Sequence, residues 1–352
     1  MDNNTELLTP ETLRLVGLAI FRALGASREE ATIVVNELIE ASLMGIDSHG
    51  VMRYIQYAEE IWSGQIKPGA VVEIVRQTPS TAIVDCGFNF GAVSAQRMIP
   101  IVCGKAAQNG IGCVVSRNSN HVGRLGSWVE RIASYNMLGL AVVNVSKSRH
   151  AVAPFGGREA RLGTNAIAWA APTTGRPIVF DASTAMISEG RLRLHAQTGE
   201  PVPAGRIIDA DGNPTTDAGA FYGPPPGAIL PFGMPLGHKG YGLALLVEVL
   251  GACLAGAQVS EEMAQRNGLC LIAINPDAFI GRDRFRALVD DLKAHVTSSA
   301  PAPGHSEVLM PGDIEQRTRA RRLVEGIPLS VETWQRILAV AKRAGATLPV
   351  TS

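Results

Sequence analysis

The sequence predicts an α/β (α+β) protein with a mixed, largely antiparallel sheet and a separate helical region. Three observations lead to this fold class. Roughly the first 65 residues show helical periodicity, the middle of the chain holds short β-prone runs, and the last part returns to amphipathic helices. Runs separated by short turns outnumber strand–helix–strand units, which favours antiparallel pairing over a doubly wound parallel sheet.

Three helices are expected in the N-terminal region. Thr9-Pro10 supplies an N-cap followed by a proline at the first helical position. Ser27 and Glu30 have the spacing of a capping box, which predicts the start of a second helix. Asp47 or Ser48 is expected to cap the third helix.

The middle of the chain supplies most of the strands, beginning with a hairpin whose two β-rich runs flank Pro79-Ser80. Strands are expected at residues 71–75, 81–84, 112–116, 138–145, 167–171, 178–180 and 269–274. Helices are expected at residues 91–108, 123–135, 240–257, 279–295, 313–325 and 331–343. Residues 201–227 are rich in Pro, Gly and Asp, so an irregular surface excursion is expected there.

The composition is that of a globular protein, with 46% hydrophobic and 18% charged residues among 352. Lys+Arg and Asp+Glu balance at 32 each, so charge gives no reason to expect a nucleic acid or an anionic membrane as partner. The five cysteines are odd in number and widely spaced, which favours reduced thiols in a cytoplasmic protein. No signal peptide is recognised, and the apolar run 243–257, interrupted by Glu248, is expected to be too short to span a bilayer.

Several chemistries are disfavoured by motifs that the sequence lacks. It has no Gly-x-Gly-x-x-Gly fingerprint between a first strand and a helix and no P-loop, so a nucleotide would have to bind outside these motifs. No two of the seven histidines lie three to five residues apart, so no metal site with local spacing is expected. A Gly-x-Ser-x-Gly nucleophile elbow is also absent.

The most informative segment runs from Asp47 to Tyr57. Ser48-His49-Gly50 lies at the expected start of the third helix, and Arg53 and Tyr57 follow His49 by four and eight residues. On a helix, these spacings place three side chains on one face. A proton carrier, a guanidinium that can grip a carboxylate and a hydroxyl would then point the same way. The segment predicts an enzyme acting on a small acidic substrate.

Further candidates lie at turns between expected elements. Residues 117–126, which include His121, follow a strand and open a helix, where partial positive charge favours anions. An ordinary helix-capping connection would have a similar sequence. Weaker candidates, each of which also fits a common turn, cap or solvated cation, are residues 154–157, Gly163-Thr164-Asn165, Asp181 and Lys239.

In their order along the chain, these motifs resemble the type 2 malate/L-lactate dehydrogenase family, which also includes ureidoglycolate and sulfolactate dehydrogenases and cyclic-imine carboxylate reductases. The similarity extends from about residue 8 to about residue 345. It is carried by Ser48-His49-Gly50 with Arg53, Asn120-His121, residues 153–157, Gly163-Thr164-Asn165, Asp181, residues 209–217, Lys239 with residues 240–244, and Pro311-Gly312-Asp313. The resemblance implies a non-Rossmann fold like that of L-sulfolactate dehydrogenase, an NAD(P)-dependent oxidoreductase and a homodimer.

The resemblance also implies roles for individual residues. The catalytic candidates are His49, His121 and Ser48, where Ser48 could orient the His49 ring and either histidine could donate the proton. The substrate-binding candidates are Arg53, Tyr57 and Thr164. The cofactor-binding candidates are His121, Gly123, Arg124, Leu125, Ser146, Asp181, Ala182, Ser183, Lys239 and His305.

Two domains are expected to carry these roles. Residues 1–70 would form a helical substrate-side domain, joined by the C-terminal helices of residues 240–352. Residues 71–239 would form a sheet-rich domain that binds NAD or NADP. No metal is expected.

The sequence departs from the family pattern at several positions, and the one at residue 191 bears on the substrate. Ala166 stands where Pro is usual, Ala182-Ser183 replaces Met-Ala, and His238 replaces Tyr. Arg191 stands where the imine reductases tend to carry Asp. Arg191 could instead face a second substrate carboxylate or a cofactor phosphate, although a solvated surface arginine is the plainer interpretation.

The expected function is hydride transfer between nicotinamide and C2 of a small 2-hydroxy or 2-oxo acid of the malate or lactate type. One alternative keeps the fold and reduces a cyclic imine carboxylate, 1-pyrroline- or 1-piperideine-2-carboxylate, with NADPH; Arg191 disfavours it. The other is a nucleotide or metabolite binder without catalytic activity. Arg191, Lys147 and Arg149 are candidates for contact with a 2′-phosphate.

Overall fold

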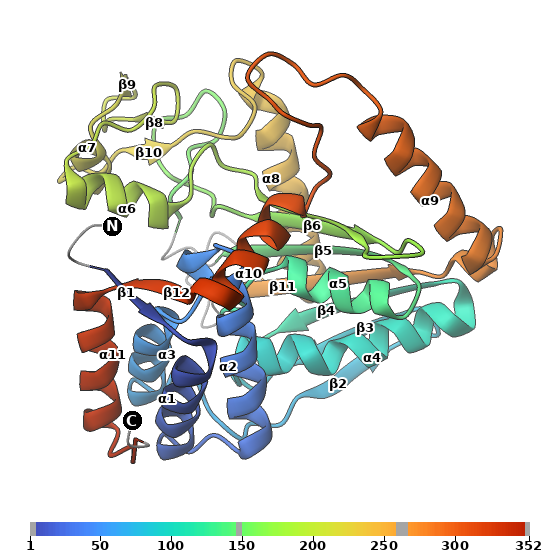
Figure 1. The fold of residues 1–352 in the computed structure, drawn as a ribbon, viewed down its shortest axis with the longest axis horizontal. Coiled ribbons are helices and arrows are strands. Elements are labelled where there is room, and N and C mark those ends of the chain that lie inside the picture. The colour runs from blue at the N-terminus through green and yellow to red at the C-terminus, as the bar shows by residue number, and fades with distance from the viewer. Residues whose placement is uncertain (1–4, 146–149, 258–266, 349–352) are drawn as a thin grey trace.

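The computed structural model describes residues 5–145, 150–257 and 267–348. Its centre is a seven-stranded sheet of order β2-β3-β4-β11-β5-β6-β7 (Figure 1). The pair β3–β4 is parallel and every other neighbouring pair is antiparallel, which confirms the predicted mixed, largely antiparallel sheet. The strands are β2 (Glu73–Gln77), β3 (Thr81–Asp85), β4 (Ile111–Arg117), β5 (Leu138–Val145), β6 (Ala166–Ala171), β7 (Ile178–Ser183) and β11 (Asn267–Ile274).

Helices cover both faces of this sheet. Because side chains alternate along a strand, Val114 and Leu271 point to the large core cluster that includes residues of α4 (Gly91–Asn109) and α5 (Gly126–Ser134). Their neighbours in the same strands, Val115 and Cys270, point the other way, toward α8 (Gly237–Gly251) and the short 3-10 helix η3 (Cys253–Ala255). The sheet is therefore a middle layer, and its central strand β11 is buried along most of its length.

The N-terminal helices pack with the end of the chain. Helices α1 (Pro10–Ala23) and α3 (Arg53–Trp62) pack against α11 (Val331–Arg343), and α2 (Arg28–Leu43) packs against α1 (Figure 1). The first two predicted caps are confirmed: Thr9 accepts the N–H of Thr12, and Ser27 and Glu30 form a capping box. The cap predicted at Asp47 or Ser48 is wrong, because α3 begins only at Arg53 and has no side-chain cap. A two-stranded sheet that the sequence did not predict, β1 (Thr5–Leu8) with β12 (Ile327–Ser330), joins the two ends of the described chain.

The expected division into two domains remains a proposal, and the packing bears on its C-terminal boundary. Within residues 240–352, α8 packs on the sheet and β11 is inserted between β4 and β5. Helix α10 (Asp313–Glu325) contacts α2, and α11 contacts α1 and α3. The C-terminal segment that accompanies the N-terminal helices therefore begins at α10.

Residues 201–227 are more regular than predicted. They contain β8 (Ile207–Ile208), β9 (Pro214–Thr215) and α7 (Ala218–Tyr222), and β10 (Ala228–Ile229) completes a three-stranded sheet of order β10-β8-β9. Ile207 and Ile229 are fully buried in its small core. The sequence analysis also missed α6 (Glu189–Thr198), capped by Ser188. Its polar composition gives it only one buried residue, Leu192, so the apolar periodicity was weak.

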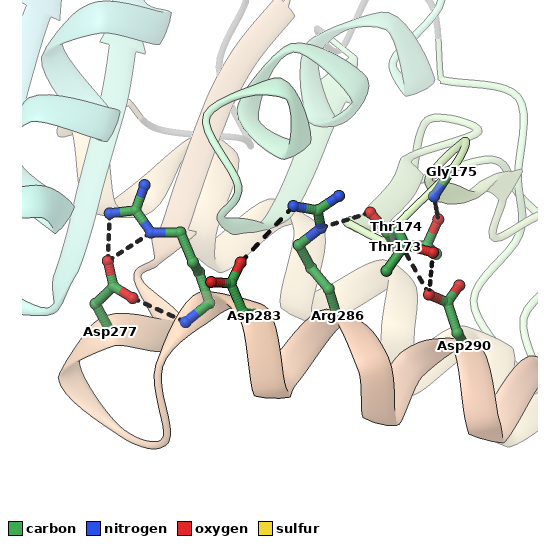
Figure 2. Close-up of polar contacts among 8 residues, drawn as sticks. Thr173, Thr174, Gly175, Asp277, Asp283, Arg286 and Asp290 are labelled. Atoms are coloured by element: carbon green, nitrogen blue, oxygen red, sulfur yellow. Dashed lines mark hydrogen bonds and ion pairs between the residues drawn. The ribbon is translucent and has the colours of Figure 1, made fainter.

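Helix α9 (Arg282–Thr297) lies at the far end of the sheet and is anchored to the turn between β6 and β7 (Figure 2). Arg286 Nε donates to the carbonyl of Thr173 at 2.7 Å. Asp290 accepts from the backbone and the hydroxyl of Thr174. These polar contacts hold α9 by one side.

One helical run among the described residues, Gly237–Ala255, is long and apolar enough to cross a membrane when judged by length and composition alone. This run begins six residues before the segment 243–257 that was predicted to be too short to span a bilayer. In the fold, the inner face of this run packs on β5 and β11, and Glu248 within it is buried.

Candidate functional site

The predicted stacking of three side chains on one helical face is wrong for His49. Asp47–His49 forms a 3-10 turn, η1, and the third helix begins only at Arg53. Gly50 between them is extended, with φ −95° and ψ −154°, so the helix cannot run through it. Arg53 and Tyr57 share α3, whereas His49 approaches them from the preceding turn.

Glycine is required at position 50 because Ser42 lies against it. A Cβ on Gly50 would overlap Ser42 Oγ. That oxygen accepts the backbone N–H of Val51 at 3.0 Å, which fixes the chain just after the turn. On the other side, Arg322 of α10 binds both carboxylate oxygens of Asp47, at 2.6 and 3.1 Å. The turn that carries Ser48 and His49 is thus held at both ends.

His49, Tyr57 and His121 form a compact group, which we call the histidine cluster. The rings of His49 and His121 stack with their centroids 5.2 Å apart and an interplanar angle of 27°. The phenolic oxygen of Tyr57 is 2.7 Å from Nδ1 of His121. Ser48 Oγ is 3.0 Å from Nδ1 of His49, as the sequence analysis proposed for ring orientation. The structure therefore brings together four candidates that come from two distant parts of the sequence.

His121 follows β4 in a loop that is fixed by the residue before it. The Asn120 side chain is fully buried, and its amide donates to the carbonyls of Gln65, Phe88 and Asn89. Gly91, the first residue of α4, lies so close to the backbone carbonyls of Asn120 and His121 that a Cβ there would overlap both. Asn120 belongs to the family motif, and no separate role was predicted for it.

The two histidines differ in what their surroundings allow. Burial, reinforced by the positive charge of Arg53, lowers the pKa of His49 to about 3. His49 is consequently neutral at physiological pH. Burial also raises the pKa of Tyr57 far above its usual value, so its phenol remains protonated.

Arg53 is half-buried at the start of α3, beside the histidine cluster. Its Nε donates to the carbonyl of Ser48 at 2.6 Å, and one Nη contacts Gln56. Gln56 in turn donates to Glu60 at 2.7 Å. The planar guanidinium group is of the kind that binds a carboxylate.

A second group of candidates meets at the turn Gly163-Thr164-Asn165, and we call it the turn cluster. Ser183 Oγ donates to the carbonyl of Thr164 at 2.7 Å, and the N–H of Thr184 donates to the same carbonyl. The Thr184 carbonyl accepts the N–H of Phe232, whose backbone lies against the first turn of α8. Thr164, the end of β7 and the helix start that carries Lys239 are thereby linked.

Asp181, on β7, is tied to the start of α5. Its carboxylate accepts the N–H of Gly126 at 2.7 Å. Burial raises its pKa, and the bond from Gly126 and the charge of Arg124 partly oppose this rise. Arg124 itself is 4% exposed and forms an ion pair with Glu130. Leu125 is buried, so it offers little side-chain surface to a ligand.

A small cavity lies beside Asp181. Ile46, just before the η1 turn, forms part of its wall, together with Asp181 of the sheet edge and Gly312 at the start of α10. The cavity therefore extends between the segment leading to His49 and the edge strand β7. Its lining residues are Met44, Ile46, Arg124, Glu130, Arg176, Pro177, Val179, Asp181, Gly312, Glu315 and Gln316.

Other candidates fall outside the described residues or lie at the surface. Ser146 lies outside the described residues, as do Lys147 and Arg149. His305 is exposed, and within the described chain its backbone bonds to Ala302. Arg191 is exposed near the start of α6, and its neighbour Gly190 is close enough to Ser48 that a Cβ would lie 3.1 Å from Ser48 Cβ.

Comparison with known proteins identifies the kind of enzyme. The family model for malate/L-lactate dehydrogenases matches residues 8–338. The chain belongs to the malate/L-lactate dehydrogenase family. The protein is therefore an oxidoreductase that acts on CH–OH groups, and dehydrogenases of this family use nicotinamide cofactors.

Individual relatives of this dehydrogenase cover almost the whole chain. It is 34% identical over 351 residues to L-sulfolactate dehydrogenase of Methanocaldococcus jannaschii, covering 97% of this chain and 98% of the relative. A solved sulfolactate dehydrogenase structure from that organism has a TM-score of 0.88 at 33% identity, covering 97% and 98% of the two chains. Hydroxycarboxylate dehydrogenase B of Escherichia coli K12 is 33% identical over 343 residues, covering 95% of this chain and 93% of the relative.

One structural neighbour carries a different activity in its name. The δ1-piperideine-2-carboxylate reductase of Pseudomonas syringae has a TM-score of 0.81 at 31% identity, covering 95% of this chain and 99% of that one. The fold is thus shared by proteins named for hydroxy acids and by one named for a cyclic imine.

Proposed function

We propose that the protein transfers a hydride between a nicotinamide cofactor, NAD or NADP, and C2 of a small 2-hydroxy or 2-oxo acid of the malate or lactate type. The observation that carries this proposal is the contact between the Tyr57 hydroxyl and Nδ1 of His121, 2.7 Å long, beside Arg53 and His49. It joins a proton carrier, a group that orients it and a carboxylate binder in one place.

His121 is the proposed acid and base. Reduction of the 2-oxo group requires a proton at the carbonyl oxygen, and oxidation requires its removal. Tyr57 holds Nδ1, so Nε2 is the ring nitrogen that exchanges the proton with the substrate oxygen. His49, with its pKa lowered to about 3, stays neutral and serves as a stacking partner and hydrogen-bonding group.

Arg53 is proposed to bind the substrate carboxylate, and Thr164 to contact the substrate from the turn cluster. A guanidinium forms two parallel bonds with a carboxylate, which fixes the plane of the 2-oxo acid. Ser48 orients the ring of His49 at 3.0 Å. Arg53 and Thr164 bind the substrate, and Ser48 orients His49. The nicotinamide, when bound, would supply or receive the hydride.

The turn cluster and β7 are the proposed cofactor side. Lys239 is exposed, and among the described residues no carboxylate pairs with it, which leaves a cation available for a phosphate or a ribose hydroxyl. Asn165 Oδ1 is buried without a hydrogen-bond partner within the described chain. Such an orphaned acceptor next to Thr164 suits a ligand that brings a donor. Asp181, Ala182 and Ser183 supply the adjacent strand end.

A homodimer is proposed for the assembly. Helix α8 presents a row of exposed apolar side chains on the face turned away from the sheet, and α9 adds others. Apolar surface of this extent in a helical layer is typical of an interface. The exposed residues are Leu243, Leu245, Leu246 and Val249 on α8, Leu254 on η3, and Leu288, Leu292 and Val296 on α9.

A cyclic imine carboxylate is the second candidate substrate, favoured by the structural likeness to the piperideine carboxylate reductase. A panel of pyruvate, oxaloacetate, sulfopyruvate, 1-pyrroline-2-carboxylate and 1-piperideine-2-carboxylate separates the two. Nicotinamide absorbance is followed with NADH and with NADPH for each compound.

Turnover with a 2-oxo acid supports the proposal, and turnover with the imines alone replaces it with the second candidate. If NAD(P)H binds, as nicotinamide fluorescence would show, but nothing is turned over, the protein is a binder and the proposal is wrong.

A further inference from the structure

Helix α8 is apolar along most of its length, but it buries one carboxylate. Glu248 is 4% exposed. Its hydrogen-bond partners among the described residues are uncharged: Asn165 Nδ2 at 2.8 Å, Asn144 Nδ2 at 3.0 Å and the backbone N–H of Gly163. A buried carboxylate that is not paired with a cation is costly compared with an apolar residue. Core packing alone therefore does not explain why a carboxylate is buried at position 248 among these hydrogen-bond donors.

All the segments that Glu248 contacts lead to proposed cofactor or substrate residues. Asn144 is close to the end of β5, two positions before Ser146. Gly163 and Asn165 flank Thr164 on either side. Lys239 lies in the first turn of α8, the helix that carries Glu248. One carboxylate thus joins three segments that are distant in the sequence.

The turn held by Glu248 has a backbone conformation that must be maintained from outside. Asn165 has a backbone φ of +36°, a value that residues other than glycine seldom adopt. Its side chain is fully buried. Its amide nitrogen donates both to Glu248 and, at 3.2 Å, to the carbonyl of Ala244 one turn earlier on α8. Helix α8 therefore grips the side chain of Asn165 at two points. In the same turn, the carbonyl of Thr164 accepts a hydrogen bond from Ser183 Oγ.

Asn144 extends the same network into the centre of the sheet. Its Oδ1 accepts the N–H of Gly268 at 2.7 Å, and its carbonyl accepts Nδ2 of Asn267 at 2.8 Å, both on β11. The close contact of Gly251 with Gly268 brings α8 against the same strand. The amide of Asn144 is thus oriented by β11, with its donor directed at Glu248.

We propose that Glu248 is a positioning residue, which locks the 163–165 turn and the end of β5 onto α8 so that Ser183 and Lys239 contact one cofactor molecule beside the substrate-binding Thr164. This inference rests on the proposed function, because the three residues are assigned to the cofactor and substrate there. It predicts that loss of the carboxylate weakens cofactor binding more than it affects the chemical step.

The direct test is Glu248→Gln, which preserves size but replaces one acceptor oxygen with an amide donor facing other donors. Dissociation constants for NADH and NADPH are measured by nicotinamide fluorescence, alongside Tm and the kinetic constants. We expect the dissociation constant of the preferred cofactor to rise about tenfold or more, corresponding to loss of one or two charge-assisted hydrogen bonds. The cofactor KM should rise similarly, while kcat at saturating cofactor stays within about threefold.

The chain offers a matched control in Glu30. It is 2% exposed and also accepts from uncharged donors, namely the backbone N–H groups of Ser27 and Gly69, each at 2.9 Å, and Asn89 Nδ2 at 2.8 Å. It lies in the N-terminal helices, with no bond to the turn cluster. Glu30→Gln should lower Tm as Glu248→Gln does but leave the cofactor dissociation constant unchanged within about twofold.

A reciprocal exchange tests the bond to the turn itself. In Glu248→Gln/Asn165→Asp, the amide and the carboxylate trade places, and aspartate tolerates a positive φ as asparagine does. The double variant should recover part of the lost cofactor affinity. If Glu248→Gln does not fold, Glu248→Asp retains the charge but cannot reach both amides, and a rise in the cofactor dissociation constant is expected there too.

Equal cofactor affinity in wild type, Glu248→Gln and Glu30→Gln would overturn this inference alone. So would a fall in kcat with an unchanged cofactor KM. Wild-type protein that binds neither NADH nor NADPH would overturn the proposed function and this inference together.

Discussion

The phenolic oxygen of Tyr57 lies 2.7 Å from Nδ1 of His121, although 64 positions separate the two residues in the chain. The same phenol is 3.4 Å from the backbone carbonyl of His121 and can donate to it while accepting from Nδ1–H. This arrangement favours the tautomer whose Nε2 lone pair can accept a proton. It also tolerates the protonated ring, so Tyr57 can hold His121 through both halves of a reaction.

Replacing Tyr57 with phenylalanine removes the hydroxyl that orients His121. We expect kcat to fall by about tenfold or more, because one hydrogen bond contributes about 1–1.5 kcal/mol. The cofactor dissociation constant should be unchanged. The control is Tyr54→Phe, on the same helix, whose buried hydroxyl donates to the carbonyl of Leu13 and does not contact His121. Equal losses of kcat in the two variants would show that Tyr57 acts through folding alone.

His121→Gln should lower kcat by about 10²–10⁴, the usual contribution of a general acid or base. It should also remove one limb of the pH dependence of kcat/KM. His49→Gln should preserve that limb, because His49 is already neutral above pH of about 3. A limb that disappears in His49→Gln and persists in His121→Gln would reverse these assignments.

The lowered pKa of His49 also makes stability depend on pH. In the unfolded chain His49 binds a proton below about pH 6.5, whereas in the folded protein it does so only near pH 3. The contribution of His49 to the free energy of unfolding is therefore fully present above pH 6.5 and is lost as the pH falls toward 3. Denaturant titrations across this range should show a shallower fall in the free energy of unfolding for His49→Gln than for wild type. Parallel curves would contradict the assignment of a neutral His49.

Arg53→Ala should raise KM for the acidic substrate by about tenfold to a hundredfold, because charged hydrogen bonds contribute about 1.5–3 kcal/mol each. Arg53→Lys should recover little of this, since an ammonium group does not match a carboxylate in two places. Added guanidinium should partly restore the alanine variant. The control Arg117→Ala removes a largely exposed arginine paired with Asp85 and should leave KM unchanged.

Gly50→Ala should disrupt the turn that carries Ser48 and His49, because its Cβ would overlap Ser42 Oγ. We expect a loss of stability of about 1–3 kcal/mol, typical of overpacking, together with lower activity. Adding Ser42→Ala removes the overlapping oxygen and should recover part of both losses in a double-mutant cycle. Purely additive effects would argue against the steric explanation.

Much of the fold could be predicted because its signals are local. The caps at Thr9 and Ser27, the hairpin of β2 and β3, and the buried strand β5 each depend on residues close in the sequence. Helix α6 could not be predicted in this way, since its exposed surface is polar and carries little periodicity. The pairing of β1 with β12 depends on contacts between the two ends of the chain.

The candidate site divides in the same way. Residue types and spacing predicted that His49, Arg53 and Tyr57 belong to one site, but they also placed His49 on the helix. The helix does not extend back to His49, because the chain is extended at Gly50, where Ser42 packs against the backbone. The stacking of His49 on His121 depends on how α3 meets the loop after β4, which no local pattern encodes. Glu248 was visible as the lone carboxylate in an apolar run, yet only its contacts with Asn144 and Asn165 indicate what it does.

The central claim is that His121 supports hydride transfer between nicotinamide and C2 of a 2-oxo acid. The most direct measurement supplies NADH or NADPH with deuterium at C4 and follows the label in the 2-hydroxy product by mass spectrometry. Wild-type protein should place deuterium at C2, and His121→Gln should do so at least about a hundredfold more slowly. Absence of the label from C2 across the 2-oxo acid panel, or an unchanged rate in His121→Gln, would contradict the account.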